Sequence, residues 1–451
     1  MARADVRHRG DLRLSLLART VAAMALLAPV AARADDASAA QDFAIHGQAT
    51  LTDQGYLAFP SPYAGGNSLP GTAQGRETFD ATLFIGVRPW QGAEIWAAPE
   101  IDQGFGLQNT LGVAGFPSGE AYKVGRTNPY LRFDRLFLRQ TVDVGGASSK
   151  IDPDLMQLGG SQTENRLVFT VGRFAVTDVF DGNAYAHDPR HDFLNWTLID
   201  AGTFDYAADA WGYTVGAAAE WYQGPWTLRA GLFDLSEVPN SQKLDPDLGQ
   251  FQIVAEAARR YSLAGKDGSV AVTGFLSRGR MGLFSDAVAL GEAEDETPDT
   301  AKVRHYRSRP GVSLDVQQDL GGGFGAFARA GWADGHVEPY EFTDVDESVS
   351  GGLSVNGKRW GRNNDTVGLA GVVNAISKDH QAYLAAGGLG ILVGDGQLPR
   401  YATENILETY YDIGLKSFLH LTIDYQFVDH PAYTPERGPV SVFAARLHAQ
   451  F

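Results

Sequence analysis

Apolar and polar residues alternate along most of this chain, most regularly over residues 441–451, which read SVFAARLHAQF. One register of this segment is apolar and contains Phe443, Ala445, Leu447, Ala449 and Phe451. The other register ends with Arg446, His448 and Gln450. Successive side chains of a β-strand point to opposite faces, so the pattern predicts a closing strand with one apolar side and one water-facing side. We expect it to pair with residues 45–52, which alternate in the same way.

The alternation recurs as a series of hairpins. Segments such as Tyr213–Trp221 and Trp226–Leu232 are joined by tight turns rich in glycine, asparagine and aspartate. Longer polar connections fall at the opposite ends of the hairpins, at 104–128, 178–209, 279–309, 334–346 and 378–400. The predicted fold class is therefore all-β, an antiparallel transmembrane β-barrel of about 16 strands with short periplasmic turns and long extracellular loops.

The composition limits the alternatives to a membrane barrel. The chain of 451 residues contains no cysteine, which excludes disulfides and thiolate metal sites. A net charge of −17 argues against a nucleic-acid partner. A soluble exported β-sandwich, β-helix or propeller, such as a lectin, would also alternate, because one face of its sheet packs on a core. The barrel is favoured because the polar registers here contain arginine and glutamate, while the apolar registers are small or aromatic.

Residues 1–34 have the order of a secretory signal peptide. Four arginines precede an apolar stretch, Val21–Ala28 is uncharged, and Ala32–Ala34 provides a small-x-small cleavage site. A membrane anchor needs about 20 consecutive apolar residues, and Arg19 interrupts this run. We expect a signal peptide over 1–34 and a barrel domain over 35–451, located in the cell outer membrane.

Charged side chains occupy the inward register of the predicted strands. On Leu131–Val142, outward leucines at 136 and 138 place Arg135 and Arg139 inside. The same reasoning places Arg88, Arg173, Arg229, Glu94 and Glu220 inside on other strands. Arginine presents a fixed fork of donors that suits sugar hydroxyls. The alternative for each arginine is an ion pair with a carboxylate of the wall.

Several tryptophans fall near predicted strand ends, where barrels carry aromatic girdles: Trp90, Trp96, Trp211, Trp221, Trp226 and Trp360. Trp96 differs from the others because it shares a face with Glu94. We expect its ring to offer a flat apolar surface to the C–H face of a sugar.

Signals for catalysis or metal binding are weak. The segment His187–Asp192 concentrates histidine and aspartate, but Pro189 prevents a helical pair of ligands. The sequence has no G-x-S-x-G elbow, and Gly388–Gly394 lacks the spacing of a nucleotide-binding loop. We predict no catalytic residue, no metal and no cofactor. A Ser/His pair dispersed over a barrel wall, as in outer-membrane phospholipases, remains an alternative.

Several segments resemble the carbohydrate-selective porins of the OprB type. These are 59–69 (FPSPYAGGNSL), 98–106 (APEIDQGFG), 112–121 (GVAGFPSGEA), 135–140 (RLFLRQ) and 171–196. The resemblance implies an outer-membrane barrel that admits mono- and small oligosaccharides by passive diffusion through an eyelet lined by arginine and glutamate. By matching position, it implies eyelet roles for Glu100, Arg135, Arg139, Arg173, Asp178 and Asp181. Ala98 stands where the resemblance leads us to expect asparagine, which weakens the case for a hydrogen bond there.

The predicted function is that of an outer-membrane carbohydrate porin. The full set of predicted pore-lining residues is Glu100, Arg135, Arg139, Arg173, Asp178, Asp181, Arg88, Glu94 and Trp96. The expected partners are small sugars as permeating solutes, outer-membrane lipid, and the barrel-assembly machinery, which would recognise the C-terminal strand ending at Phe451. Two alternatives remain within the barrel class, an enzyme of the lipase or deacylase type and a non-selective general porin.

Overall fold

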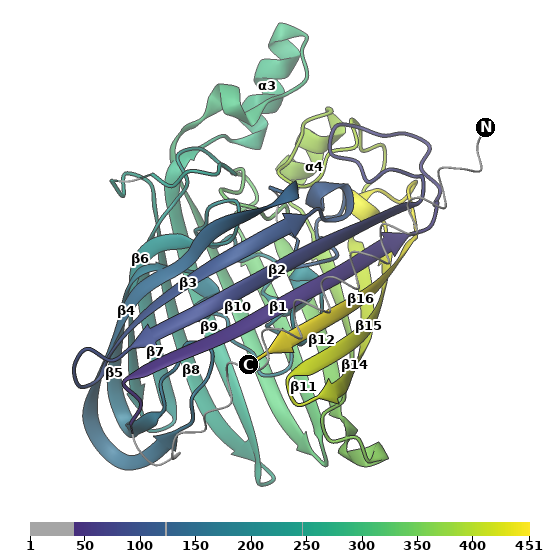
Figure 1. Ribbon diagram of the computed structural model, residues 1–451. Coiled ribbons are helices and arrows are strands. Elements are labelled where there is room, and N and C mark those ends of the chain that lie inside the picture. Colours follow the sequence, from purple (N-terminus) through teal and green to yellow (C-terminus); the bar gives the residue numbers. More distant parts are fainter. Residues whose placement is uncertain (1–39, 122–123, 246) are drawn as a thin grey trace.

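Sixteen antiparallel strands form a closed barrel within residues 40–121, 124–245 and 247–451, which are the residues that the structure, a computed structural model, describes (Figure 1). The strands are β1 (Phe43–Tyr56), β2 (Gln74–Val87), β3 (Ala93–Gly104), β4 (Arg126–Ile151), β5 (Gly160–Phe174), β6 (Thr214–Gln223), β7 (Trp226–Asp234), β8 (Phe251–Leu263), β9 (Lys266–Met281), β10 (His305–Gly321), β11 (Phe324–Ala333), β12 (Glu347–Asn356), β13 (Thr366–Ala375), β14 (Glu404–Lys416), β15 (Leu419–Asp429) and β16 (Val440–Gln450). The helices are α2 (Trp196–Ile199), α3 (Phe284–Glu294) and α4 (Lys378–Ala385), with 3₁₀ turns η2 (Leu107–Thr110), η3 (Val176–Asp178), η4 (Thr300–Val303), η5 (Gly357–Trp360) and η6 (Pro431–Tyr433). The predicted barrel is confirmed, whereas the predicted signal peptide lies outside the described residues.

The barrel closes between its first and last strands. β1 and β16 pair in antiparallel register from Gln48↔Gln450 to Tyr56↔Val442, and the backbone of Phe451 continues the ladder onto Gly47. A Cβ placed on Gly47 would lie 2.5 Å from Cζ of the Phe451 ring, so the missing side chain makes room for the aromatic ring. The expected pairing of the closing strand with the first strand is confirmed.

Short and long connections alternate around the barrel. The turns β2–β3, β4–β5, β6–β7 and their successors lie at one end, which we call the short-turn rim. The long connections lie at the opposite end, where α3 and α4 rise at the top of Figure 1. All five long connections predicted from the sequence are present, and 57–73, 235–250 and 430–439 are three further ones. No helix in the described ranges is long and apolar enough to cross a membrane.

The outer face of the wall is apolar. The side chains of Leu136, Ile253, Val349 and Leu369 remain 45–61% exposed, which is typical of a barrel surface that faces lipid and not of a soluble core. Four exposed tryptophans lie at or near the turns of the short-turn rim, namely Trp90, Trp221, Trp226 and Trp360, and a fifth, Trp332, lies near the opposite rim at the end of β11. This arrangement matches the predicted girdle for these four residues.

The long connection between β5 and β6, residues 175–213, folds into the barrel, and we call it the inserted connection. Its aromatic side chains pack against the inner wall in edge-on or tilted contacts. The ring centres of Phe180 and Phe233 are 6.0 Å apart, and those of Phe193 and Tyr410 are 5.0 Å apart. The interior is therefore a packed constriction around limited open space.

The inserted connection changes the environment of the last strand. Arg446 and His448, which we expected to face water, are 0% and 1% exposed. Arg446 donates hydrogen bonds to the backbone carbonyls of Pro189 and Asp192. The predicted inward direction is correct, but the prediction of a water-facing surface is wrong at these two positions because the connection covers them.

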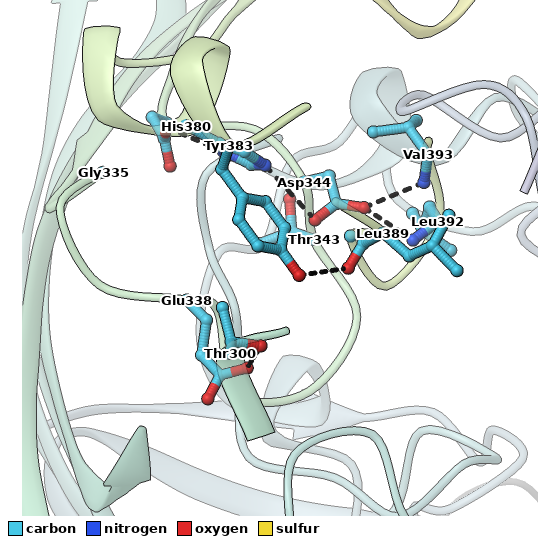
Figure 2. A network of polar contacts seen from close by, with 12 residues as sticks. Thr300, Gly335, Glu338, Thr343, Asp344, His380, Tyr383, Leu389, Leu392 and Val393 are labelled. Atoms are coloured by element: carbon cyan, nitrogen blue, oxygen red, sulfur yellow. Dashed lines mark hydrogen bonds and ion pairs between the residues drawn. The ribbon is translucent and has the colours of Figure 1, made fainter. Parts of the chain in front are cut away.

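Buried polar groups fix the long connections to one another (Figure 2). Asp344 accepts hydrogen bonds from the backbone N–H groups of Leu392 and Val393 at 2.5 and 3.0 Å. His380 of α4 lies between two carboxylates, with its ring nitrogens 3.8 Å from Asp344 and 3.1 Å from Asp346. Burial raises the pKa of the Asp344 carboxyl. These contacts join the β11–β12 connection to the β13–β14 connection at the mouth of the barrel.

Candidate functional site

A polar cavity of about 190 Å³ lies between the inserted connection and the wall at β4, and we call it the eyelet cavity. Its charged and titratable lining residues are Glu120, Arg135, Asp178, His187, Asp188, Arg190 and Asp200. Its aromatic lining residues are Trp196, Tyr206, Trp211 and Tyr213. The cavity therefore combines opposite charges with flat apolar rings.

One ion pair at the eyelet cavity joins β4 to the inserted connection. Nη2 and Nε of Arg135 lie 2.7 and 2.8 Å from the two carboxylate oxygens of Asp178, a two-point contact. Asp178 also accepts a hydrogen bond from the backbone N–H of Ala175 at 3.0 Å, which fixes it in η3. The Arg135 guanidinium lies 4.9 Å from the ring centre of Tyr213. Donors, acceptors and an aromatic face thus stand side by side.

A β-bulge in β4 turns Arg135 toward this cavity. Ala98 of β3 pairs with Arg135, but Pro99 pairs with Phe133, so Asp134 is skipped in the register. Proline has no N–H to donate to the ladder, which explains the shift at this point. As a result Asp134 is buried on the inner side, next to Arg135.

Arg173 holds the far end of the inserted connection. Its guanidinium forms an ion pair with Asp209 and donates through Nε to the carbonyl of Phe133 at 3.0 Å. Asp209 in turn accepts hydrogen bonds from the backbone N–H groups of Trp211 and Tyr213, at 2.9 and 3.3 Å. Arg173 therefore positions two aromatic residues of the cavity.

Two arginines that the sequence analysis did not single out bind a row of buried carboxylates. Arg132 lies 3.3, 2.6 and 2.7 Å from Glu100, Asp102 and Asp134. Arg190 of the inserted connection lies 3.5, 3.8 and 3.3 Å from Asp80, Glu100 and Glu120. Glu100 is 0% exposed. It therefore lies behind the cavity lining, where it bridges the two arginines.

Arg88, Glu94 and Arg139 form a separate group near the short-turn rim. Glu94 lies 3.3 Å from Arg88 and 3.8 Å from Arg139. Both arginines also donate to backbone carbonyls of the β4–β5 turn, at Gly159 and Met156 respectively. The structure thus places these three predicted residues outside the eyelet cavity, in the wall ion pairs that the sequence analysis kept as the alternative.

Trp96 does not offer its ring to the lumen, so that prediction is wrong. Its side chain is 0% exposed, and its Nε1 donates to Glu94 at 2.9 Å. The ring lies above Gly86, where a Cβ would come within 2.4 Å of it, and stacks against His46 with ring centres 6.3 Å apart. The wall encloses the ring on these sides.

Trp211 was predicted to belong to the girdle, and this prediction is also wrong. It lines the eyelet cavity, where its Nε1 donates to the hydroxyl of Tyr130 at 3.0 Å. The guanidinium of Arg132 lies 5.2 Å from its ring centre, within the range of a cation–π contact.

Asp181 lies in the inserted connection but away from the cavity lining. It accepts a hydrogen bond from the backbone N–H of Ala201 at 2.6 Å and lies 3.7 Å from Arg329 of the wall. Its surroundings fit an anchor of the connection. Among the described residues, no three His, Cys, Asp or Glu side chains form a group that could hold a metal ion.

Comparison with known sequences places these features in a family. The sequence model described as "Carbohydrate-selective porin, OprB family" matches residues 67–451. The chain belongs to this family. It is also 25% identical over 297 residues to Porin AaxA of Chlamydia abortus, a match that covers 65% of this chain and 56% of that protein. The chain therefore spans little more than half of that relative.

Solved structures show the same barrel. OprB of Pseudomonas putida, in a high-pH structure, is 16% identical, with a TM-score of 0.68 and coverage of 91% of this chain and 94% of that one. The outer membrane channel DcaP of Acinetobacter baumannii is 12% identical, with a TM-score of 0.52 and coverage of 91% and 97%. The family and the fold place this OprB-family porin in the outer membrane and indicate a channel rather than an enzyme.

Proposed function

We propose that this OprB-family porin lets neutral mono- and small oligosaccharides diffuse passively through the eyelet cavity. The observation that carries the proposal is the two-point Arg135–Asp178 pair in the same cavity as the rings of Trp211 and Tyr213. Of the predicted pore-lining residues, we assign direct contact with the sugar to Arg135 and Asp178. We assign a role in positioning the cavity lining to Glu100, Arg173 and Asp181.

The chemistry of the cavity suits a polyhydroxylated solute. A hydroxyl group both donates and accepts, and the guanidinium and the carboxylate supply the matching donors and acceptors. Because the two charges are paired, an ion gains little net attraction, whereas a neutral sugar exchanges bound water for hydrogen bonds to both groups. The aromatic rings offer apolar contact to the C–H faces. The concentration gradient drives passage, with no catalytic step, metal or cofactor.

The remaining parts of the proposal concern export and assembly. We assign residues 1–34 to a signal peptide and 35–451 to the barrel, whose apolar outer face contacts outer-membrane lipid and whose short-turn rim faces the periplasm. We also assign recognition by the barrel-assembly machinery to β16 and Phe451. The pairing of Phe451 with Gly47 at the seam supports this assignment.

Single-channel recording in planar lipid bilayers tests the sugar site. Glucose should reduce the wild-type ionic current in a saturable manner, and Arg135→Gln should weaken that block. Arg400→Gln is the matched control, because Arg400 is 71% exposed and pairs with Glu436 outside the cavity. Current that is insensitive to glucose in the wild type would favour the non-selective porin. Absence of current together with ester or amide hydrolysis would favour the barrel enzyme.

A further inference from the structure

A second cavity, of about 330 Å³, lies at the short-turn rim, and we call it the rim cavity. It is bounded by the start of β1, the β4–β5 turn, the β14–β15 turn and the end of β16. The inserted connection borders both cavities, because His187 to Arg190 line the eyelet cavity and His191 lines the rim cavity. The two cavities therefore adjoin the same segment of the inserted connection, residues 187–191, with the rim cavity on the short-turn side.

Four histidines from four different segments line the rim cavity: His46, His191, His420 and His448. His448 is 1% exposed, and its Nδ1 lies 3.1 Å from the Thr50 hydroxyl. Its Nε2 has no hydrogen-bond partner among the described residues, and the same is true of Nε2 of His46. A buried polar atom without a partner is uncommon in a native protein and calls for a ligand or another explanation.

The other two imidazoles are each held through one nitrogen. Nδ1 of His420 lies 2.6 Å from Asp412, which leaves its second nitrogen on the opposite side of the ring. Nε2 of His191 lies 3.1 Å from Oε1 of Gln450, another residue of the cavity lining. Hydrogen bonds to residues of β1, β16 and β14 therefore orient His448, His191 and His420 around one space.

The lining points to a neutral solute with hydroxyl groups. An uncharged imidazole has one donor and one acceptor nitrogen, which match the two functions of a hydroxyl. Asp154 on the β4–β5 turn faces the same cavity and disfavours an anion. The described residues contain no group that could hold a metal ion. The volume lies near the lower end of the range of about 300–1,000 Å³ for small-molecule sites.

We propose that the rim cavity is a second carbohydrate subsite, which receives a monosaccharide after it has passed the eyelet. This inference rests on the proposed function, because it assumes that sugars reach the rim cavity through the eyelet. The four histidines and Gln450 supply the hydrogen bonds, and Pro153, Asp154 and Leu155 of the β4–β5 turn form one wall of the site.

The test measures block of the ionic current by glucose added from one side of a planar bilayer at a time. Block of the wild-type current should show two saturable components, one of which appears preferentially when glucose is added from the short-turn side. His46→Ala and His420→Ala should each weaken that component about fivefold, as expected for the loss of one hydrogen bond. His305→Ala is the matched control, since this exposed histidine starts β10 at the opposite rim. It should leave both components unchanged.

Further variants keep the test decisive. His448→Gln retains a donor and an acceptor at the buried position, and heat-dependent gel mobility checks that each variant still forms a barrel. If Arg135→Gln weakens one component while the histidine variants change neither, the rim subsite is wrong and the eyelet proposal stands. If glucose has no effect on the wild type from either side, the proposed function itself fails.

Discussion

Neutralising one member of the Arg135–Asp178 pair should give the channel a charge preference whose sign depends on the member removed. Asp178→Asn keeps the shape of the side chain and an oxygen that can accept from Ala175, but leaves the Arg135 charge unbalanced. Arg135→Gln leaves the Asp178 charge unbalanced. We expect Asp178→Asn to favour chloride over potassium and Arg135→Gln to favour potassium over chloride.

The expected size of the change in the permeability ratio follows from the geometry of the Arg135–Asp178 pair. The two side chains are 12% and 16% exposed, so their surroundings lie between bulk water and the protein interior. An ion about 4 Å from an unpaired charge interacts by about 1 kcal/mol in water and about 4 kcal/mol at an effective dielectric constant of about 20. Because a permeating ion keeps much of its hydration shell, the value of about 1 kcal/mol for water is used. It corresponds to a change of about fivefold in the permeability ratio.

Reversal potentials in asymmetric potassium chloride measure this ratio. The double variant Arg135→Gln/Asp178→Asn should return close to the wild-type value, because its local charge is again balanced. Asp286→Asn on α3 is the control, since Asp286 forms an exposed pair with Arg307 far from the eyelet. Unchanged reversal potentials in both single variants would refute the assignment of this pair to the conduction path.

Three further perturbations test the anchors of the channel. Arg190→Ala removes one ion-pair partner from each of three buried carboxylates, at a cost of about 3 kcal/mol, and should release the inserted connection, so single-channel conductance should rise. Unaltered conductance would contradict a constricting role. Asp344→Ala leaves two backbone N–H groups unpaired, at about 1–3 kcal/mol each, and should speed hydrogen exchange at Leu392 and Val393, whereas Asp344→Asn should have a smaller effect. Equal exchange in all three proteins would contradict the role of Asp344 in joining the β11–β12 and β13–β14 connections. Deleting Phe451 should lower the yield of heat-modifiable barrels several-fold while export across the inner membrane continues, and normal yield would remove its assembly role.

The barrel follows from local sequence pattern because a strand has a period of two residues and each hairpin carries its own turn signal. Strand β4 shows where this reasoning needs care. Leu131 and Phe133 face outward, and so do Leu136 and Leu138, so the outward register moves from odd to even positions between them. That change in parity is visible in the sequence and marks the bulge that turns Arg135 inward.

The composition of the eyelet depends on contacts that no local pattern records. Trp211 and Trp221 both lie close to the ends of β6, yet Trp211 lines the cavity and Trp221 is exposed on the wall. The difference arises because Trp211 belongs to the inserted connection. Its path is set by Arg173 at the end of the adjoining β5, by Arg190 against Asp80 of β2, and by Arg446 on β16. The strand register gives no direction for the Arg190 side chain, because this residue lies in a loop.

The most direct test of the central claim is swelling of liposomes that contain the purified protein, measured in isosmotic solutions of single solutes. If the paired charges of the eyelet admit neutral polyols, arabinose and glucose should enter faster than zwitterionic amino acids of similar size. Arg135→Gln should reduce this difference. Equal entry of sugars and amino acids through the wild type would contradict carbohydrate preference.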